Sequence, residues 1–556
     1  MLGLLTVSDS IVEHWLLCTL SVAVIYQSIT STYTLFRMCP AHSGAESLAG
    51  LPFTLLSVAT AIYGSGETIK STQKIPFMAQ GSLMTLLLLG DRFRHRPDGV
   101  MIASPRGYYD IYNSKANVKR SKWYAVTRDE EDATLNATDK TPLSRKKLLK
   151  AIFSEKGLRS MEPFLIKHID RWIELLLDGD ETKNMSTWAS PKNLGSEWID
   201  YLVFDILGDL CFGKSFDTKE PEVKNPFRPI PYTIGKYTQF MYPIANSPFL
   251  NTWVWLKPRG INKMLKMITP EPMKNYFRFL EEAIKGRIEQ EESLGEYDRQ
   301  EGRKDIFHYL FAAQDPDSNK PVFDRSELLS TANLLVIAGS NTTSTSLCSI
   351  FFYLSRNQRV YDKLAREIRN GFDSIDDIRA GVALHNCQYL HACVIEGLRM
   401  TASVASELPR EVLPGGHEID GYWYPAGTVV GTPNLAVRYH QETFKDPFVF
   451  RPERWIPNEE VTSDDVAALK QAFTPFSVEG NACPGKKLAL LEMSITIARL
   501  LYNCDFRRPP SDISNCGGGR PEYGWLRRSK EHYQTIDAWI AIRNGPMIQL
   551  RRRSSD

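Results

Sequence analysis

One cysteine, Cys483, lies in the segment of this chain best suited to chemistry. Segment 473–493 reads FTPFSVEGNACPGKKLALLEM, and in it a turn carrying Cys483 leads directly into an apolar-periodic helix. The start of a helix presents free N–H groups and a partial positive charge, which favour a thiolate over a thiol. A thiolate so placed can be the axial ligand of a haem iron, although a lone intracellular cysteine is more often a small buried hydrophobe.

A pair of charged residues on an expected helix forms a second candidate site. Glu396 and Arg399 stand three positions apart, so their side chains share one helix face and can pair. The irregular, proline-containing segment 450–455 (FRPERW) offers Arg454 to the same carboxylate. Two guanidinium groups around one carboxylate form a hydrogen-bonded knot that tolerates burial.

A third candidate is segment 335–344, LVIAGSNTTS, an apolar helical run that small and hydroxyl-bearing residues interrupt. A glycine within a helix costs about 1 kcal/mol relative to alanine. The glycine at position 339 therefore indicates a packing or functional reason for its presence.

The order of these segments resembles that of the cytochrome P-450 superfamily of haem-thiolate monooxygenases, from roughly residue 91 to the C-terminus. The resemblance implies the cytochrome P-450 fold: mainly α with small β-sheets, in one large haem domain. Several segments are similar to those of filamentous-fungal microsomal members, many of which tailor secondary metabolites. These segments are 96–100, 110–118, 153–163 and 421–430.

The resemblance also implies roles for individual residues. Cys483 would be the axial ligand of the haem iron, and Thr342 would donate or relay a proton to bound dioxygen, with Asn341 beside it. Glu396, Arg399 and Arg454 match the family's structural triad. The other residues implied to contact the haem are Phe476, Gly485, Ala338 and Gly339.

The haem-binding loop departs from the family pattern at two positions. Glu479 stands where a glycine is usual, and Asn481 stands where an arginine or histidine usually reaches a haem propionate. Because an asparagine cannot neutralise a carboxylate, other cations must contribute. The candidates for these propionate contacts are Arg145, Lys146, Lys147 and Arg410.

The reaction that the resemblance implies is hydroxylation or oxidation of a small apolar metabolite. Its cofactor would be haem b, its co-substrate O2, and its electron source an NADPH-cytochrome reductase. Three alternatives stay open on the sequence: a haem-thiolate isomerase or dehydratase that uses no O2, a non-catalytic haem-binding protein, and turnover with peroxide only.

Composition limits the remaining functions. The 556 residues are 43% apolar, enough for a large core, and 67 basic residues against 65 acidic ones leave a net charge of +2. This balance gives no electrostatic case for nucleic acid as a partner. Nine cysteines without regular spacing argue against a disulfide framework and indicate a reducing compartment.

The chain divides into three expected parts. Residues 15–36 carry no charge and would span about 33 Å as a helix, enough to cross a bilayer core, so 1–37 is predicted to be a membrane anchor. Arg37 after this span predicts a cytosolic catalytic domain at the endoplasmic reticulum membrane. Residues 38–90 form an atypical linker or membrane-proximal segment, and 91–556 form the haem domain.

The middle of the chain is predicted to be helical. Apolar periodicity indicates helices over 160–177 and 198–212. The proline- and aromatic-rich region 219–273 would, by the resemblance, cover the entry to the substrate site.

Overall fold

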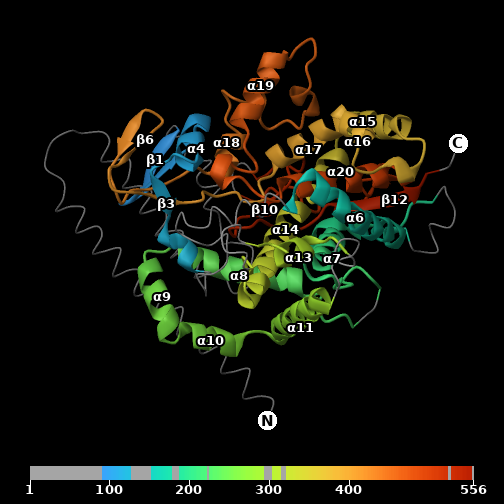
Figure 1. The fold of residues 1–556 in the computed structure, drawn as a ribbon. Coiled ribbons are helices and arrows are strands. Elements are labelled where there is room, and N and C mark those ends of the chain that lie inside the picture. The colour runs from blue at the N-terminus through green and yellow to red at the C-terminus, as the bar shows by residue number, and fades with distance from the viewer. Residues whose placement is uncertain are drawn as a thin grey trace.

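A computed structural model describes seven stretches of the chain: residues 91–126, 152–177, 187–221, 224–293, 303–314, 321–523 and 527–553 (Figure 1). The predicted anchor at 1–37, the segment 38–90, and the cations Arg145, Lys146 and Lys147 lie outside these residues. The structure is mainly helical, with small β-sheets.

The central element is α14 (Arg325–Leu354), which lies in the middle of the helical body and packs against α7, α17 and α20 (Figure 1). Its first turn is fixed by a capping box, in which Asp324 and Glu327 each satisfy a backbone N–H of the other residue. The other long helices are α6 (Glu155–Leu176), α7 (Ile199–Phe212), α11 (Glu271–Ser293), α17 (Gln388–Met400) and α20 (Lys486–Asn503).

Shorter helices complete the body. The proline- and aromatic-rich region 219–273 is largely helical and forms the three helices α8, α9 and α10. The shorter α-helices are α4 (Pro105–Tyr112), α8 (Ile230–Ala245), α9 (Leu250–Leu256), α10 (Ile261–Ile268), α13 (Ile306–Phe311), α15 (Gln358–Gly371), α16 (Val382–Asn386), α18 (Asn434–Arg438) and α19 (Ser463–Ala472). Single helical turns are η1 (Lys122–Val126), η3 (Leu194–Trp198), η4 (Lys257–Arg259), η5 (Ile375–Asp377), η6 (Pro452–Trp455), η7 (Glu479–Asn481) and η8 (Asp512–Asn515).

The strands form four small sheets. The largest has the order β1-β2-β8-β5-β3, in which β2 and β8 pair in parallel and the other neighbours are antiparallel. A second sheet has the order β4-β12-β9, and two hairpins are β6-β7 and β10-β11. The strands are β1 (Arg92–Arg96), β2 (Gly99–Ile102), β3 (Val118–Arg120), β4 (Lys192–Asn193), β5 (Arg410–Val412), β6 (His417–Ile419), β7 (Tyr422–Tyr424), β8 (Val429–Gly431), β9 (Cys504–Arg507), β10 (Thr535–Ile536), β11 (Ile542–Arg543) and β12 (Met547–Arg552).

Among the described residues, α14 alone is long and apolar enough to cross a membrane. Its most apolar window is 72% buried inside the protein, which is typical of the core helix of a folded domain. The helix therefore acts as the scaffold of the body, on which α7, α11, α17 and α20 pack.

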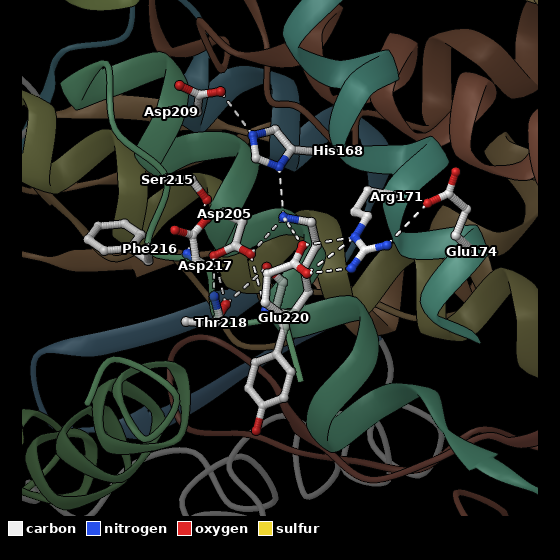
Figure 2. Close-up of polar contacts among 12 residues, drawn as sticks. His168, Arg171, Glu174, Asp205, Asp209, Ser215, Phe216, Asp217, Thr218 and Glu220 are labelled. Atoms are coloured by element: carbon white, nitrogen blue, oxygen red, sulfur yellow. Dashed lines mark hydrogen bonds and ion pairs between the residues drawn. The ribbon is translucent and has the colours of Figure 1, made fainter. Parts of the chain in front are cut away.

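A buried ionic cluster joins α6 to α7 (Figure 2). The Lys219 ammonium lies 3.1 Å from Asp205 and 3.0 Å from Nδ1 of His168. Because an ammonium group only donates, Nδ1 accepts, and Nε2 must carry the proton that it donates to Asp209 over 2.9 Å. Arg303 pairs with the other oxygen of Asp209 at 2.8 Å. These contacts tie α6 to α7, and α7 packs against α14.

Candidate active site

The Cys483 loop ends where α20 begins. The backbone N–H of Cys483 donates to the carbonyl of Phe476 over 2.7 Å, which closes the turn, and Gly485 is the N-cap of α20. The Cys483 side chain is solvent-accessible. A Cβ placed on Gly485 would lie 4.0 Å from Sγ, so this residue adjoins the sulfur.

The pKa of Cys483 differs from the prediction made from the helix start. Desolvation by the surrounding protein raises the pKa of the thiol, and this outweighs the hydrogen bonds from the N–H groups of Gly485 and Lys486, which lower it. The N–H groups at the helix start therefore do favour the thiolate, as expected, but desolvation outweighs them in the protein by itself. A coordinating metal cation deprotonates a thiol, so Cys483 would become a thiolate when it holds a metal ion.

Glu396 is the centre of a buried knot of hydrogen bonds. Arg399 donates to it in a bidentate manner, over 2.8 and 2.9 Å, and Nε of Arg454 donates over 3.1 Å. Burial alone would raise the pKa of Glu396, but attraction from both arginines and a backbone hydrogen bond from Arg451 outweigh it, so the pKa is lowered. The carboxylate therefore stays ionised inside the protein.

The knot joins α17 to the irregular segment 438–455. Arg399 also donates to the carbonyl groups of Arg438 and Pro447, and Arg454 donates to that of Lys445 over 2.8 Å. Sequence reasoning missed one further donor, the indole N–H of Trp455, which bonds Glu396 over 2.9 Å. In the sequence, only the position of Trp455 directly after Arg454 indicates that it could contact Glu396.

The accessible face of α14 carries Ala338, Gly339 and Thr342, while Thr343 is buried. The hydroxyl of Thr342 donates to the carbonyl of Ala338 over 2.7 Å. A Cβ on Gly339 would lie 2.8 Å from Leu207 of α7, so close helix packing is the physical reason for this glycine.

Asn341, the residue before Thr342, lies on the buried side of α14 and is 8% exposed. The backbone of Thr342 is in turn held by the segment that follows α17. The hydroxyl of Ser403, in the segment after α17, donates to the carbonyl of Thr342 over 3.0 Å. This contact brings the segment 401–410 against the accessible face of α14.

Arg410, at the far end of that segment, is a buried cation. Its guanidinium group donates to the hydroxyl of Tyr124 over 2.9 Å and to the carbonyl of Leu408 over 3.0 Å, and it lies over the ring of Tyr112. Within the described residues it has no ion pair with a carboxylate. Burial lowers the pKa of Arg410, but neighbouring tyrosines outweigh this and raise it.

Arg438 is a second buried cation, which sequence reasoning missed. It is 8% exposed and donates to the carbonyl groups of Leu398 and Thr401. Its charge acts on Tyr108, whose hydroxyl bonds Thr474 and Ser477 of the Cys483 loop. Burial lowers the pKa of Arg438 to about 10, and it too lacks a carboxylate partner among the residues described.

These donors fit a haem. The accessible thiol of Cys483 is suited to the iron, and the buried cations Arg410 and Arg438 have charge that the propionates of a haem would balance. Asn481 takes a different part, because its amide donates to the carbonyl of Tyr112 over 2.8 Å. The propionate contacts would therefore fall to residues outside the loop.

Comparison with known proteins agrees with this donor set. The model of the cytochrome P-450 family matches residues 96–528. Cytochrome P-450 monooxygenase apf7 of Gibberella fujikuroi is 30% identical over 84% of this chain and 86% of its own length. Cytochrome P-450 monooxygenase poxM of Penicillium oxalicum is 31% identical over 83% of both chains.

A solved structure shows the same fold. The crystal structure of a cytochrome P-450 haem domain, P450DA, matches with a TM-score of 0.65 over 86% of this chain and 93% of that chain, at 15% identity. The chain belongs to the cytochrome P-450 family. Within that family it is a monooxygenase, and its cofactor is a haem with a thiolate ligand.

Proposed function

We propose that this monooxygenase hydroxylates or otherwise oxidises a small apolar metabolite, as a tailoring step in fungal secondary metabolism. The observation that carries the proposal is the accessible Cys483 thiol at the start of α20, in a chain that also forms the buried knot around Glu396. The similarity to fungal monooxygenases over most of the chain supports a role in fungal metabolism.

Cys483 would hold the iron of haem b, and Arg410 and Arg438 would bind its propionates. The bound haem supplies the activation of O2 and the oxidation of a C–H bond. The protein contributes orientation and electrostatics. Two buried guanidinium groups offer fixed positive charge, and the knot around Glu396 holds α17, which immediately precedes the segment leading to Arg410.

Thr342 would hold a proton for the reaction at its Oγ1. This hydroxyl lies on the accessible face of α14, and its hydrogen bond to the carbonyl of Ala338 fixes its direction. Ala338 carries no side chain beyond Cβ, so it adds little bulk next to this hydroxyl. Asn341 carries an amide where an acid would donate a proton, so the hydroxyl of Thr342 is the proton donor that the sequence offers here.

The electrons would come from an NADPH-cytochrome reductase at the endoplasmic reticulum membrane, where residues 1–37 would form a single-pass anchor. The surface of α10 supports membrane association. Met264, Met267 and Ile268 are 47–73% exposed, and Lys263 and Lys266 stand among them. Exposed apolar and basic residues on one short helix suit an anionic lipid surface.

The carbon monoxide difference spectrum tests the thiolate ligand. A thiolate produces the red-shifted Soret band of the reduced carbon monoxide complex, and a hydroxyl does not. Cys483→Ser should abolish this band, and an unchanged spectrum would refute the assignment.

Turnover with NADPH and reductase, compared with turnover on peroxide alone, separates an O2-dependent monooxygenase from the peroxide-only alternative.

A further inference from the structure

The backbone of the Cys483 loop is strained at two residues. Ser477 has φ of 60° and Glu479 has φ of 41°, in the left-handed region that favours glycine. Both belong to the tight turn that ends at Cys483, in which the N–H of Asn481 donates to Val478 and that of Ala482 donates to Glu479. A conformation of this kind persists only where surrounding contacts hold it.

The contacts that hold Glu479 come from the end of α4. One carboxylate oxygen accepts a hydrogen bond from the hydroxyl of Tyr109. The other accepts from both the N–H of Ser114, over 2.9 Å, and its hydroxyl, over 2.5 Å. Because Ser114, Tyr109 and the N–H of Ser114 all donate to it, the pKa of Glu479 is lowered to about 2 and the group stays ionised.

This contact runs against the helix dipole. A carboxylate near a helix C-terminus faces partial negative charge and is disfavoured there. Three donors on one carboxylate overcome this, which indicates a specific bond rather than a chance surface contact. The amide of Asn481 makes a further bond to α4, at the carbonyl of Tyr112. Both residues that depart from the family pattern in this loop therefore bind the same helix end.

The α4 helix is fixed in turn to the rest of the site. The hydroxyl of Tyr112 donates to the carbonyl of Leu408 over 3.0 Å and accepts from the N–H of Thr432 over 3.2 Å. The ring of Tyr112 lies 5.1 Å from the Arg410 guanidinium carbon. A series of contacts thus leads from Glu479 through α4 to Arg410.

We propose that Glu479 is a positioning residue, whose carboxylate locks the Cys483 loop onto the end of α4 and so fixes the sulfur relative to Arg410. The proposal rests on Cys483 being the haem ligand. The carboxylate of Glu479 is bound by Tyr109 and Ser114, and no hydrogen bond joins it to Cys483 within the described residues. Its effect is on how long the loop keeps the sulfur in the geometry that binds iron.

The test uses the full-length, haem-loaded protein with the variants Glu479→Ala and Tyr109→Phe. The rate at which the red-shifted Soret band of the reduced carbon monoxide complex is lost on warming reports the sulfur–iron bond. Loss of the bonds to an ionised group should accelerate this rate about three- to tenfold for Glu479→Ala, and by less for Tyr109→Phe. Glu459→Ala, at an exposed position, is the matched control and should leave the rate unchanged.

Two further measurements separate positioning from general stability. The far-ultraviolet circular dichroism melting midpoint should stay that of the wild type in Glu479→Ala. Adding Tyr109→Phe to Glu479→Ala should produce no further acceleration, because the two groups share one bond. Equal rates for wild type and Glu479→Ala, additive rates in the double variant, or a melting midpoint that falls in step with the band would overturn the proposal.

Failure of the ligand assignment gives a different result. If Cys483→Ser keeps the band, Cys483 is not the ligand, and the positioning proposal falls with that assignment. If Cys483→Ser loses the band while Glu479→Ala behaves as wild type, the ligand assignment stands and the positioning proposal alone is refuted.

Discussion

A buried acid on α20, Glu492, makes a pH-dependent contribution to stability that can be measured. The residue lies nine positions after Cys483 and is 2% exposed. Desolvation raises the pKa of its carboxyl group from 4.5 to about 8. At neutral pH the group is therefore mainly protonated in the folded protein and ionised in the unfolded chain.

The sign of the effect follows from proton binding. Between pH 4.5 and 8 the folded state binds more protons at Glu492 than the unfolded state, so the free energy of unfolding falls as the pH rises through this window. At about 1.4 kcal/mol per pH unit, integration from pH 5 to 8 gives a loss of about 3–4 kcal/mol, an upper estimate for a fully buried group. Glu492→Gln keeps the shape of the side chain and cannot titrate, so it should lack this loss.

The assay is urea-induced unfolding of the haem-loaded wild type and Glu492→Gln at pH 5, 6.5 and 8. The stability advantage of the variant should grow steadily over this series, by about 3–4 kcal/mol in total. Glu459→Gln, at an exposed position, is the control for the loss of one charge and should show no such growth. A difference between Glu492→Gln and wild type that is constant from pH 5 to 8 would refute burial as the cause.

Two further predictions concern the knot and the α14 helix. Arg454→Ala should abolish haem incorporation, since removing one arginine from the buried Glu396 knot costs about 3–5 kcal/mol, and a variant with wild-type haem content and turnover would contradict this. Thr342→Ala should keep haem and substrate binding but divert NADPH electrons to hydrogen peroxide, whereas Thr343→Ala, at a buried position, should not. Product formed per NADPH oxidised distinguishes the two, and uncoupling in Thr343→Ala alone would mean that the motif is misplaced by one residue.

The helices that follow local periodicity could be predicted from the sequence. Periodicity predicted helices over 160–177 and 198–212, and the structure has α6 at Glu155–Leu176 and α7 at Ile199–Phe212. The pairing of Glu396 with Arg399 follows from their spacing on one helix, and it is present with Arg454 on the same carboxylate. Their role in holding the haem stays a prediction.

Properties that depend on distant segments could not be predicted. The raised pKa of Cys483 arises from desolvation by the folded protein, whereas the sequence shows only the helix start that opposes it. The bond between Tyr109 and Glu479 joins residues 370 positions apart. Arg438 belongs to no motif in the sequence, and only its burial beside Thr401 and its charge on Tyr108 place it at the site.

The two departures in the Cys483 loop have one physical consequence in common. Neither Glu479 nor Asn481 can neutralise a haem propionate, and both instead bind the end of α4, through Ser114 and the carbonyl of Tyr112. Hydrogen bonds to the end of α4 therefore hold the Cys483 loop in position. The positive charge that the propionates require would come from Arg410 and Arg438, which are fixed by the segments around α17 and α18. Position and charge, which a single arginine in the loop could supply together, are divided here between different parts of the chain.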